Sequence, residues 1–168
     1  MQQERGNIMK TTLVAYFSAS GTTARVAKDL AGAIGADLFE IAPVEPYSAA
    51  DLNWNDKASR SSVEMNDESC RPAIAAKVND MAAYDTVFVG FPVWWYVEPR
   101  IIDTFLEAYD FSGKTVVPFA TSGGSGLGRA PQRMQALVPG AKVLQGGLLN
   151  GRFSQEKLAD WAERALEV

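Results

Sequence analysis

Residues 11–23, TTLVAYFSASGTT, decide the fold. The first seven are apolar, β-branched or aromatic, a composition typical of a short strand buried on both faces. The next six, residues 18–23, hold four hydroxyl side chains and one glycine. An amphipathic helical pattern follows, with Val26, Leu30 and Ile34 on one stripe. The segment therefore predicts a strand, a polar turn and a helix.

The same alternation of apolar runs and helical patterns continues along the chain. Further strands are expected at 37–41, 86–91 and 115–120, with a weaker one from 143, and helices at about 73–83, 99–109 and 128–138 and after Ser154. Pro118 is expected where the hydrogen-bond ladder of its strand is interrupted. Buried strands that alternate with helices predict a parallel sheet covered on both faces, hence one α/β domain. The domain is expected over residues 11–168, after a flexible polar extension, residues 1–10.

Composition excludes several classes of protein. The 168 residues are 47% apolar and 21% charged, close to the averages of a single globular domain. The longest apolar run is far shorter than the roughly 20 residues of a membrane span. The 16 Lys and Arg are scattered among 20 Asp and Glu, so no basic surface for nucleic acid is expected. A soluble protein without nucleic-acid or membrane partners is the expectation.

Histidine is absent and Cys70 is the single cysteine. This excludes histidine acid–base chemistry, Ser-His-Asp triads and almost every zinc site, and it prevents a disulfide within the chain. No metal ligands or catalytic side chains are predicted, and Cys70 is expected to be an incidental thiol. Since residues 1–10 lack the apolar core of a signal peptide, the cytoplasm is the expected location. Any catalysis would depend on a cofactor.

Three loops follow the carboxyl ends of predicted strands, where open α/β sheets bind ligands. The first, residues 18–23, combines hydroxyls with the free N–H groups of a helix N-terminus and predicts an anion site. It lacks the lysine of a Walker A loop, so a single phosphate fits best. Capping of the helix alone would require only one such hydroxyl.

The other two loops have different chemistry. Residues 92–97 place three aromatics in sequence after a buried strand, and three neighbours cannot all face one core. At least one is expected to project and offer a stacking surface. Residues 121–126 are small and glycine-rich, and their backbone N–H groups suit the polar edge of a ring. A phosphorylated planar cofactor fits all three loops, and flavin mononucleotide (FMN) is the natural candidate.

These motifs resemble those of the flavodoxin family over residues 11–166, nearly the whole chain. The resemblance implies a three-layer sandwich with a five-stranded parallel sheet in the order 2-1-3-4-5, the order that flavodoxins show. It also implies noncovalent FMN. The implied phosphate contacts are Ser18, Ser20, Gly21, Thr22 and Thr23; the implied ring contacts are Pro92, Val93, Trp94, Trp95 and Tyr96 on one side and Thr121, Ser122, Gly123, Gly124 and Gly126 on the other.

The sequence leaves several functions open. One is electron transfer through FMN, to a protein partner or to a small acceptor such as a quinone. Alternatives are an NAD(P)H-dependent FMN or quinone reductase of the same fold and a non-redox phosphate- or nucleotide-binding module. A net charge of −4 is weak for a carrier that docks by electrostatic steering. A homodimer with the tryptophans at its contact is a further alternative.

Two further features bear on the site. The polar stretch 44–84 is long for a connection between strands. The resemblance implies that such a segment covers the flavin or shapes a substrate pocket; the alternative is an ordinary surface loop and helix. Tyr47, Trp54 and Lys57 are its candidates for approaching the ring. Glu98 and Arg100 flank Pro99 at a helix start and are expected to be solvated.

Overall fold

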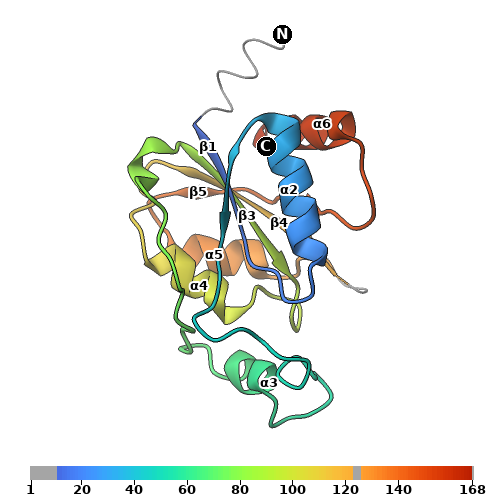
Figure 1. The fold of residues 1–168 in the computed structure, drawn as a ribbon. Coiled ribbons are helices and arrows are strands. Elements are labelled where there is room, and N and C mark those ends of the chain that lie inside the picture. The colour runs from blue at the N-terminus through green and yellow to red at the C-terminus, as the bar shows by residue number, and fades with distance from the viewer. Residues whose placement is uncertain (1–10, 123–125, 168) are drawn as a thin grey trace.

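The computed structural model describes residues 11–122 and 126–167 (Figure 1). The expected extension, residues 1–10, and two expected ligand contacts, Gly123 and Gly124, lie outside these ranges. The elements are β1 (Thr12–Tyr16), α2 (Thr22–Ile34), β2 (Asp37–Glu40), α3 (Arg60–Met65), the 3-10 helix η1 (Met81–Ala83), β3 (Thr86–Pro92), α4 (Arg100–Glu107), β4 (Thr115–Thr121), α5 (Ala130–Leu137), β5 (Lys142–Val143), β6 (Gly147–Leu148) and α6 (Gln155–Leu166).

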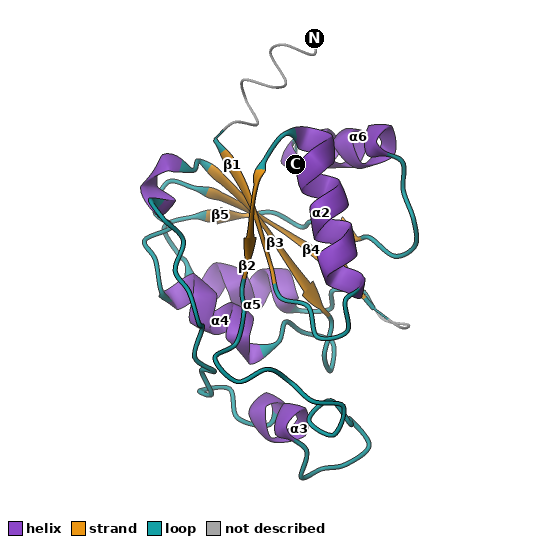
Figure 2. Cartoon of the chain, in the orientation of Figure 1, coloured by secondary structure: helices purple, strands orange, loops and turns teal. Residues whose placement is uncertain are grey.

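The strands form one parallel sheet in the order β2-β1-β3-β4-β5 (Figure 2). The predicted topology is therefore confirmed. Parallel neighbours need a crossover connection, and helices supply most of these connections. All strands consequently end at the same edge of the sheet, which gathers the three predicted loops in one place.

The fifth strand position is shared by two short strands. β5 pairs with Thr115 and Val116, whereas β6 pairs with Phe119 and Ala120. Pro118 lies between these two pairings. The backbone carbonyls of Val116 and Ala120 each accept a hydrogen bond from the side of β4 on which β5 and β6 lie. The backbone of Pro118, two residues from each, faces the same side, but proline has no N–H to donate there. The predicted interruption of the ladder at Pro118 is confirmed.

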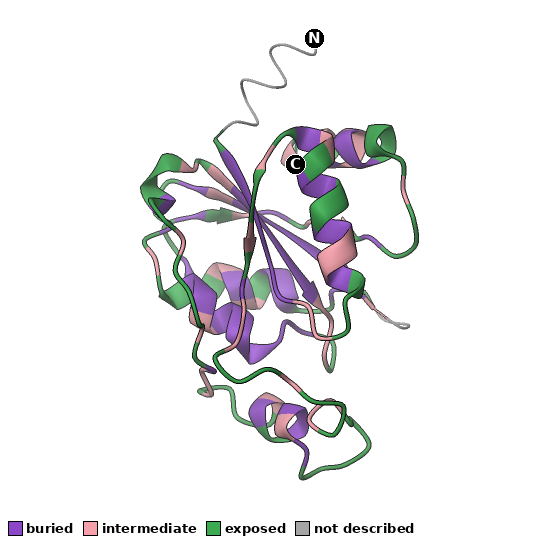
Figure 3. Cartoon of the chain, viewed as in Figure 1, coloured by how far each residue is buried: buried purple, intermediate pink, exposed green. Residues whose placement is uncertain are grey.

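Helices cover both faces of the sheet. Alternate residues of the first strand point to opposite faces, so Leu13 and Ala15 join a core beneath α4 and α5, and Val14 and Tyr16 join one beneath α2 and α6. Figure 3 shows the buried central strands between the two helical layers. Among the residues that the structure describes, no helix has both the length and the apolar character that a membrane crossing requires.

The stretch between β2 and η1 differs from its prediction. The helix expected at 73–83 is wrong except for the three residues of η1, and α3 lies earlier in the chain. Val44 donates to the carbonyl of Ala73 (2.9 Å), and Ala75 donates to that of Ala42 (2.8 Å). These bonds hold the backbone around residue 74 in extended pairing, so it cannot start a helix. They also close the neck of a loop, the 44–73 segment, which extends beyond the carboxyl edge of the sheet (Figure 1).

Candidate functional site

The first loop ends at an uncapped helix N-terminus. Gly21, the N-cap of α2, has φ 95° and offers no side chain, and Ser18 Oγ accepts a bond from Gly21 N (3.1 Å) instead of capping the helix. The hydroxyls of Ser20 and Thr22 are exposed beside it. Among the residues that the structure describes, no side chain caps this 13-residue helix, so its N-terminus presents N–H donors and a partial positive charge to any anion placed there.

Thr23 has a different role from its neighbours. Its side chain is 2% exposed, and its Oγ1 lies 2.8 Å from Oγ1 of Thr121. Thr121 is the last residue of β4, so this hydrogen bond joins the first loop to the third. The hydroxyl of Thr23 thus serves to hold two loops together.

The aromatic loop is a tight turn with left-handed backbone. Trp94 and Val97 exchange two backbone hydrogen bonds of 3.0 and 3.1 Å, and the two residues between them, Trp95 and Tyr96, have φ of 48° and 68°. Positive φ at both central positions is the geometry of a type I′ turn. It is unusual for bulky residues and costs free energy that the surroundings must offset.

This turn separates the three aromatic side chains. Trp94 is half-buried, and its ring centroid lies 5.7 Å from that of Phe17 and 5.6 Å from that of Tyr47, both edge-on. Trp95 is 45% exposed and Tyr96 is 68% exposed. The prediction that at least one aromatic projects from the core is confirmed, and two of them do.

Gly128, two residues after the third loop, supports the strained turn. Arg129 N donates to the carbonyl of Tyr96 at 3.3 Å. A Cβ on Gly128 would lie 2.1 Å from the same carbonyl oxygen, and Gly128 itself has φ of 57°. Only glycine allows this approach without strain.

Asn150 holds the start of the third loop and was not predicted from the sequence. Its side-chain oxygen accepts from Ser122 N and its side-chain nitrogen donates to Ser122 O, both at 2.9 Å. The only sequence signal is an Asn-Gly pair among the irregular residues after the fifth strand, which by itself indicates a turn. Gly126, further along the loop, is exposed.

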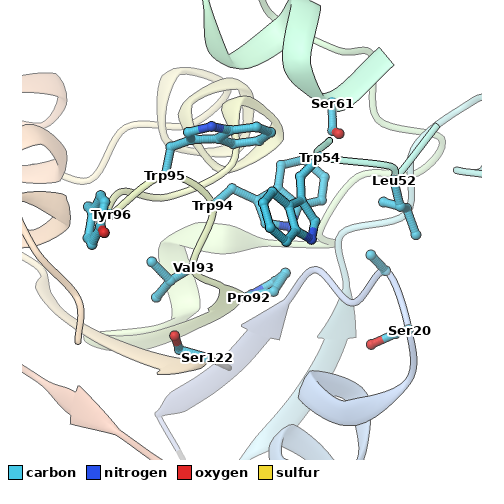
Figure 4. A pocket seen from close by; sticks show the side chains of 11 residues that line it. Ser20, Leu52, Trp54, Ser61, Pro92, Val93, Trp94, Trp95, Tyr96 and Ser122 are labelled. Atoms are coloured by element: carbon cyan, nitrogen blue, oxygen red, sulfur yellow. The ribbon is translucent and has the colours of Figure 1, made fainter. Parts of the chain in front are cut away.

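The loops open onto a pocket of about 650 Å³ (Figure 4), within the range of roughly 300–1,000 Å³ that is usual for small-molecule sites. It is lined by Ala19, Ser20, Leu52, Trp54, Ser61, Pro92, Val93, Trp94, Trp95, Tyr96 and Ser122. None of these side chains carries a charge. Of the three candidates in the 44–84 stretch, Trp54 lines the pocket, whereas Tyr47 packs behind Trp94 and Lys57 is exposed elsewhere.

Known proteins share this fold and this order of loops. The sequence profile of the flavodoxin family matches residues 11–165. The chain belongs to the flavodoxin family. No curated protein matches it in sequence.

Solved structures agree with the assignment. A candidate flavoprotein from Bacteroides eggerthii is 51% identical, with a TM-score of 0.87, and the match covers 92% of this chain and 97% of that one. A second, from Bacteroides uniformis, is 53% identical, with a TM-score of 0.86, covering 92% and 98%. A flavoprotein from Lactobacillus acidophilus, in complex with FMN, shares the fold at 23% identity and a TM-score of 0.68, covering 91% and 99%.

Buried charges lie directly behind the aromatic loop of this flavodoxin. Glu98 and Asp103 are fully buried and Arg100 is 3% exposed, so the expectation that Glu98 and Arg100 are solvated is wrong. Arg133 of α5 lies with Nε 3.4 Å from Glu98 and Nη2 3.6 Å from Asp103. Arg100 Nη1 lies 3.7 Å from Asp103. Because α4 packs against α5, charged side chains that the sequence pattern placed in solvent form a buried ion cluster.

Glu98 is the perturbed acid of this cluster. Burial, followed by the neighbouring carboxyl group of Asp103, raises the pKa of Glu98 to about 9. Within the described residues, neither carboxyl oxygen of Glu98 meets a hydrogen-bond partner. The raised pKa favours the protonated form of Glu98 at neutral pH, and Arg100 and Arg133 both lie beside the carboxyl group of Asp103.

Arg100 also anchors the 44–73 segment. Its guanidinium donates to the carbonyls of Glu64 (3.3 Å), Met65 (2.8 Å) and Asp67 (3.2 Å) at the end of α3. Glu64 and Met65 are the last two residues of α3 and Asp67 follows its C-cap, so the guanidinium lies at the negative end of the helix dipole, where a cation is favoured.

Tyr47 fixes the other side of the same segment. Its hydroxyl donates to Glu64 Oε1, and the Arg60 guanidinium lies 3.8 Å from the centre of its ring and binds Glu64 Oε2 at 2.9 Å. Burial and the bond to Glu64 raise the pKa of Tyr47 far above its usual value, so the phenol stays protonated. Burial likewise raises the pKa of the half-buried Cys70 thiol, as expected of a thiol without a reactive role.

Proposed function

We propose that this chain binds FMN noncovalently at the three loops and transfers electrons through it. The observation that carries the proposal is the uncapped N-terminus of α2, flanked by exposed hydroxyls and adjoining an uncharged aromatic pocket. A helix N-terminus accommodates a phosphate, and an aromatic wall accommodates a planar ring. The Lactobacillus acidophilus flavoprotein, which shares this fold, is a complex with FMN.

The residues divide between the two ends of the cofactor. Ser18, Ser20, Gly21, Thr22 and Thr23 would hold the phosphate; Pro92, Val93, Trp94, Trp95 and Tyr96 would flank the ring; Thr121, Ser122, Gly123, Gly124 and Gly126 would contact its polar edge. Since the hydroxyl of Thr23 is bonded to Thr121, Thr23 would contribute its backbone N–H. When bound, the flavin supplies the redox chemistry, and the chain sets its affinity, orientation and potential.

A comparison of FMN with riboflavin tests the phosphate assignment. The apoprotein is titrated with each flavin, and quenching of flavin fluorescence gives the dissociation constant. FMN should bind at least about tenfold more tightly, because charge-assisted bonds to a helix N-terminus contribute roughly 1.5–3 kcal/mol each. Replacement of Ser20 and Thr22 by alanine should weaken the binding of FMN but leave the affinity for riboflavin unchanged.

Ser112→Ala provides the matched control, because Ser112 precedes β4, at the opposite end of that strand from Thr121. It should not change either dissociation constant. Equal affinities for FMN and riboflavin would overturn the phosphate site. Failure of both flavins to bind would overturn the proposed function as a whole.

The reductase alternative is tested with the same FMN-loaded protein. A reductase should lose its flavin absorbance on addition of NADPH alone, whereas an electron carrier should require a separate reductant. The uncharged pocket lining does not favour NADPH, since it offers no cation to the pyrophosphate of a nicotinamide nucleotide.

A further inference from the structure

One wall of the pocket does not come from the three loops that follow β1, β3 and β4. The 44–73 segment contributes Leu52, Trp54 and Ser61, which line the pocket on the side away from Trp95 and Tyr96 (Figure 4). Trp54 is 70% exposed although it lines the pocket. An indole on a pocket wall that leaves most of its surface uncovered is a contact surface for a ligand rather than part of the core.

This wall is held in place from several sides. The neck of the segment is closed by the backbone bonds between Val44 and Ala73 and between Ala42 and Ala75. Arg100 binds the end of α3, and Arg133 reaches the exposed Glu68 at 2.9 Å. The segment is therefore built into the domain, and Trp54 is presented by a fixed support, as a binding site requires.

The chemistry of the lining indicates which ligands fit. It has no charged side chain, and its surface consists mainly of indole, phenol and aliphatic groups, with the three hydroxyls of Ser20, Ser61 and Ser122. Such a surface favours a neutral, planar molecule and leaves a phosphate or carboxylate without a partner. Ser20 lines this pocket and also belongs to the proposed phosphate loop, whereas Gly21, Thr22 and Thr23 do not line it, so the pocket adjoins the phosphate site and extends from it toward Trp54.

We propose that Trp54 forms a subsite for a neutral planar electron acceptor of the quinone class, beside the position proposed for the flavin ring. The inference rests on the proposed function. A quinone bound there would take up two electrons and two protons and leave as the hydroquinone, while the reduced flavin returns to its oxidised form. The electrons would reach the flavin from a soluble reductant, which in the experiment is dithionite.

Binding is measured first, without turnover. The FMN-loaded protein is titrated with 2-methyl-1,4-naphthoquinone while both partners are oxidised, and the change in flavin absorbance gives the dissociation constant. Trp54→Ala should raise this constant at least about fivefold, the loss expected for one aromatic contact. Trp54→Phe should recover most of the affinity. Val63→Ala is the matched control, because Val63 lies in the same segment, is 56% exposed and does not line the pocket.

The same variants separate the possible outcomes. The FMN dissociation constant should be unchanged in Trp54→Ala; a rise matching that for the quinone would assign Trp54 to the flavin site and overturn the subsite. After anaerobic reduction with dithionite, reoxidation by limiting naphthoquinone should slow by the same factor as binding weakens. If FMN binds and Trp54→Ala changes neither naphthoquinone binding nor reoxidation, the subsite is wrong while the flavin site stands.

Discussion

Oγ1 of Thr23 lies 2.8 Å from Oγ1 of Thr121, and both side chains are buried. The two residues are 98 positions apart and belong to the start of α2 and the end of β4. Their hydrogen bond fixes the distance between the proposed phosphate loop and the proposed ring-edge loop. The geometry that FMN would meet is thus set before it binds.

Replacement of Thr121 by valine should therefore weaken both stability and flavin binding. Valine keeps the shape of the threonine side chain but leaves the Thr23 hydroxyl buried without this partner. The loss should lower the free energy of unfolding by about 1–3 kcal/mol. The free energy of unfolding in urea and the FMN dissociation constant measure the two effects. Thr121→Ser, which keeps the hydroxyl, should retain most of both; equal losses in the two variants would show that the hydrogen bond is unimportant.

Gly128→Ala should destabilise the aromatic loop. The added Cβ would lie 2.1 Å from the carbonyl oxygen of Tyr96, and the backbone at Gly128 has φ of 57°. Together, the close contact and the positive φ should lower the free energy of unfolding by more than about 1 kcal/mol. This loss should appear as a lower midpoint of thermal unfolding of the apoprotein. Gly126→Ala, two residues away, is the control, because a Cβ there meets no atom of the described residues within 4 Å. A midpoint unchanged by Gly128→Ala would contradict the close approach.

Glu98 should make stability depend on pH. Its pKa is raised to about 9 in the folded protein, whereas an unfolded glutamate titrates near its ordinary 4.5. The folded state then binds the extra proton between these values, so stability is greatest below the lower value and falls as pH rises toward 9. The slope is at most about 1.4 kcal/mol per pH unit. Asp103 and Arg133 face Glu98, and Arg100 faces Asp103.

Glu98→Gln isolates this dependence, since glutamine imitates the protonated acid. Urea unfolding at several pH values should show the wild-type chain losing stability relative to the variant between about pH 5 and pH 9. Parallel profiles for the two proteins would mean that Glu98 titrates normally.

Arg100→Met should release the 44–73 segment and leave Asp103 without its neighbouring cation in the same helix. Removal of one partner from a buried ion pair typically costs about 3–5 kcal/mol. The segment should also become the first site of limited proteolysis. Arg152→Met makes the same chemical change at an exposed position. Its free energy of unfolding should stay within about 0.5 kcal/mol of that of the wild type. Similar proteolysis of both variants would refute the anchoring role of Arg100.

Local patterns account for what was predicted correctly. The alternation of residues along β1, the stripe of α2 and the hydroxyl-rich turn between them depend on neighbours within a few positions, so residues 11–34 are enough to predict them. Strand order followed from the resemblance to flavodoxins. The prediction of a helix at 73–83 was wrong because the start of this stretch pairs with residues 42–44, which lie far away in the sequence and belong to no local pattern.

By itself, the sequence determined the α/β class, the positions of the central strands and the chemistry of each loop, because these follow from residue types at short spacing. Tertiary structure alone decided that Glu98 and Arg100 are buried, that Asn150 holds Ser122, that Thr23 meets Thr121 and that Trp54 lines the same pocket as the aromatic loop. Each of these depends on groups far apart in the chain. Burial and pairing are properties of the assembled surfaces, and only the packing of the layers brings those surfaces together.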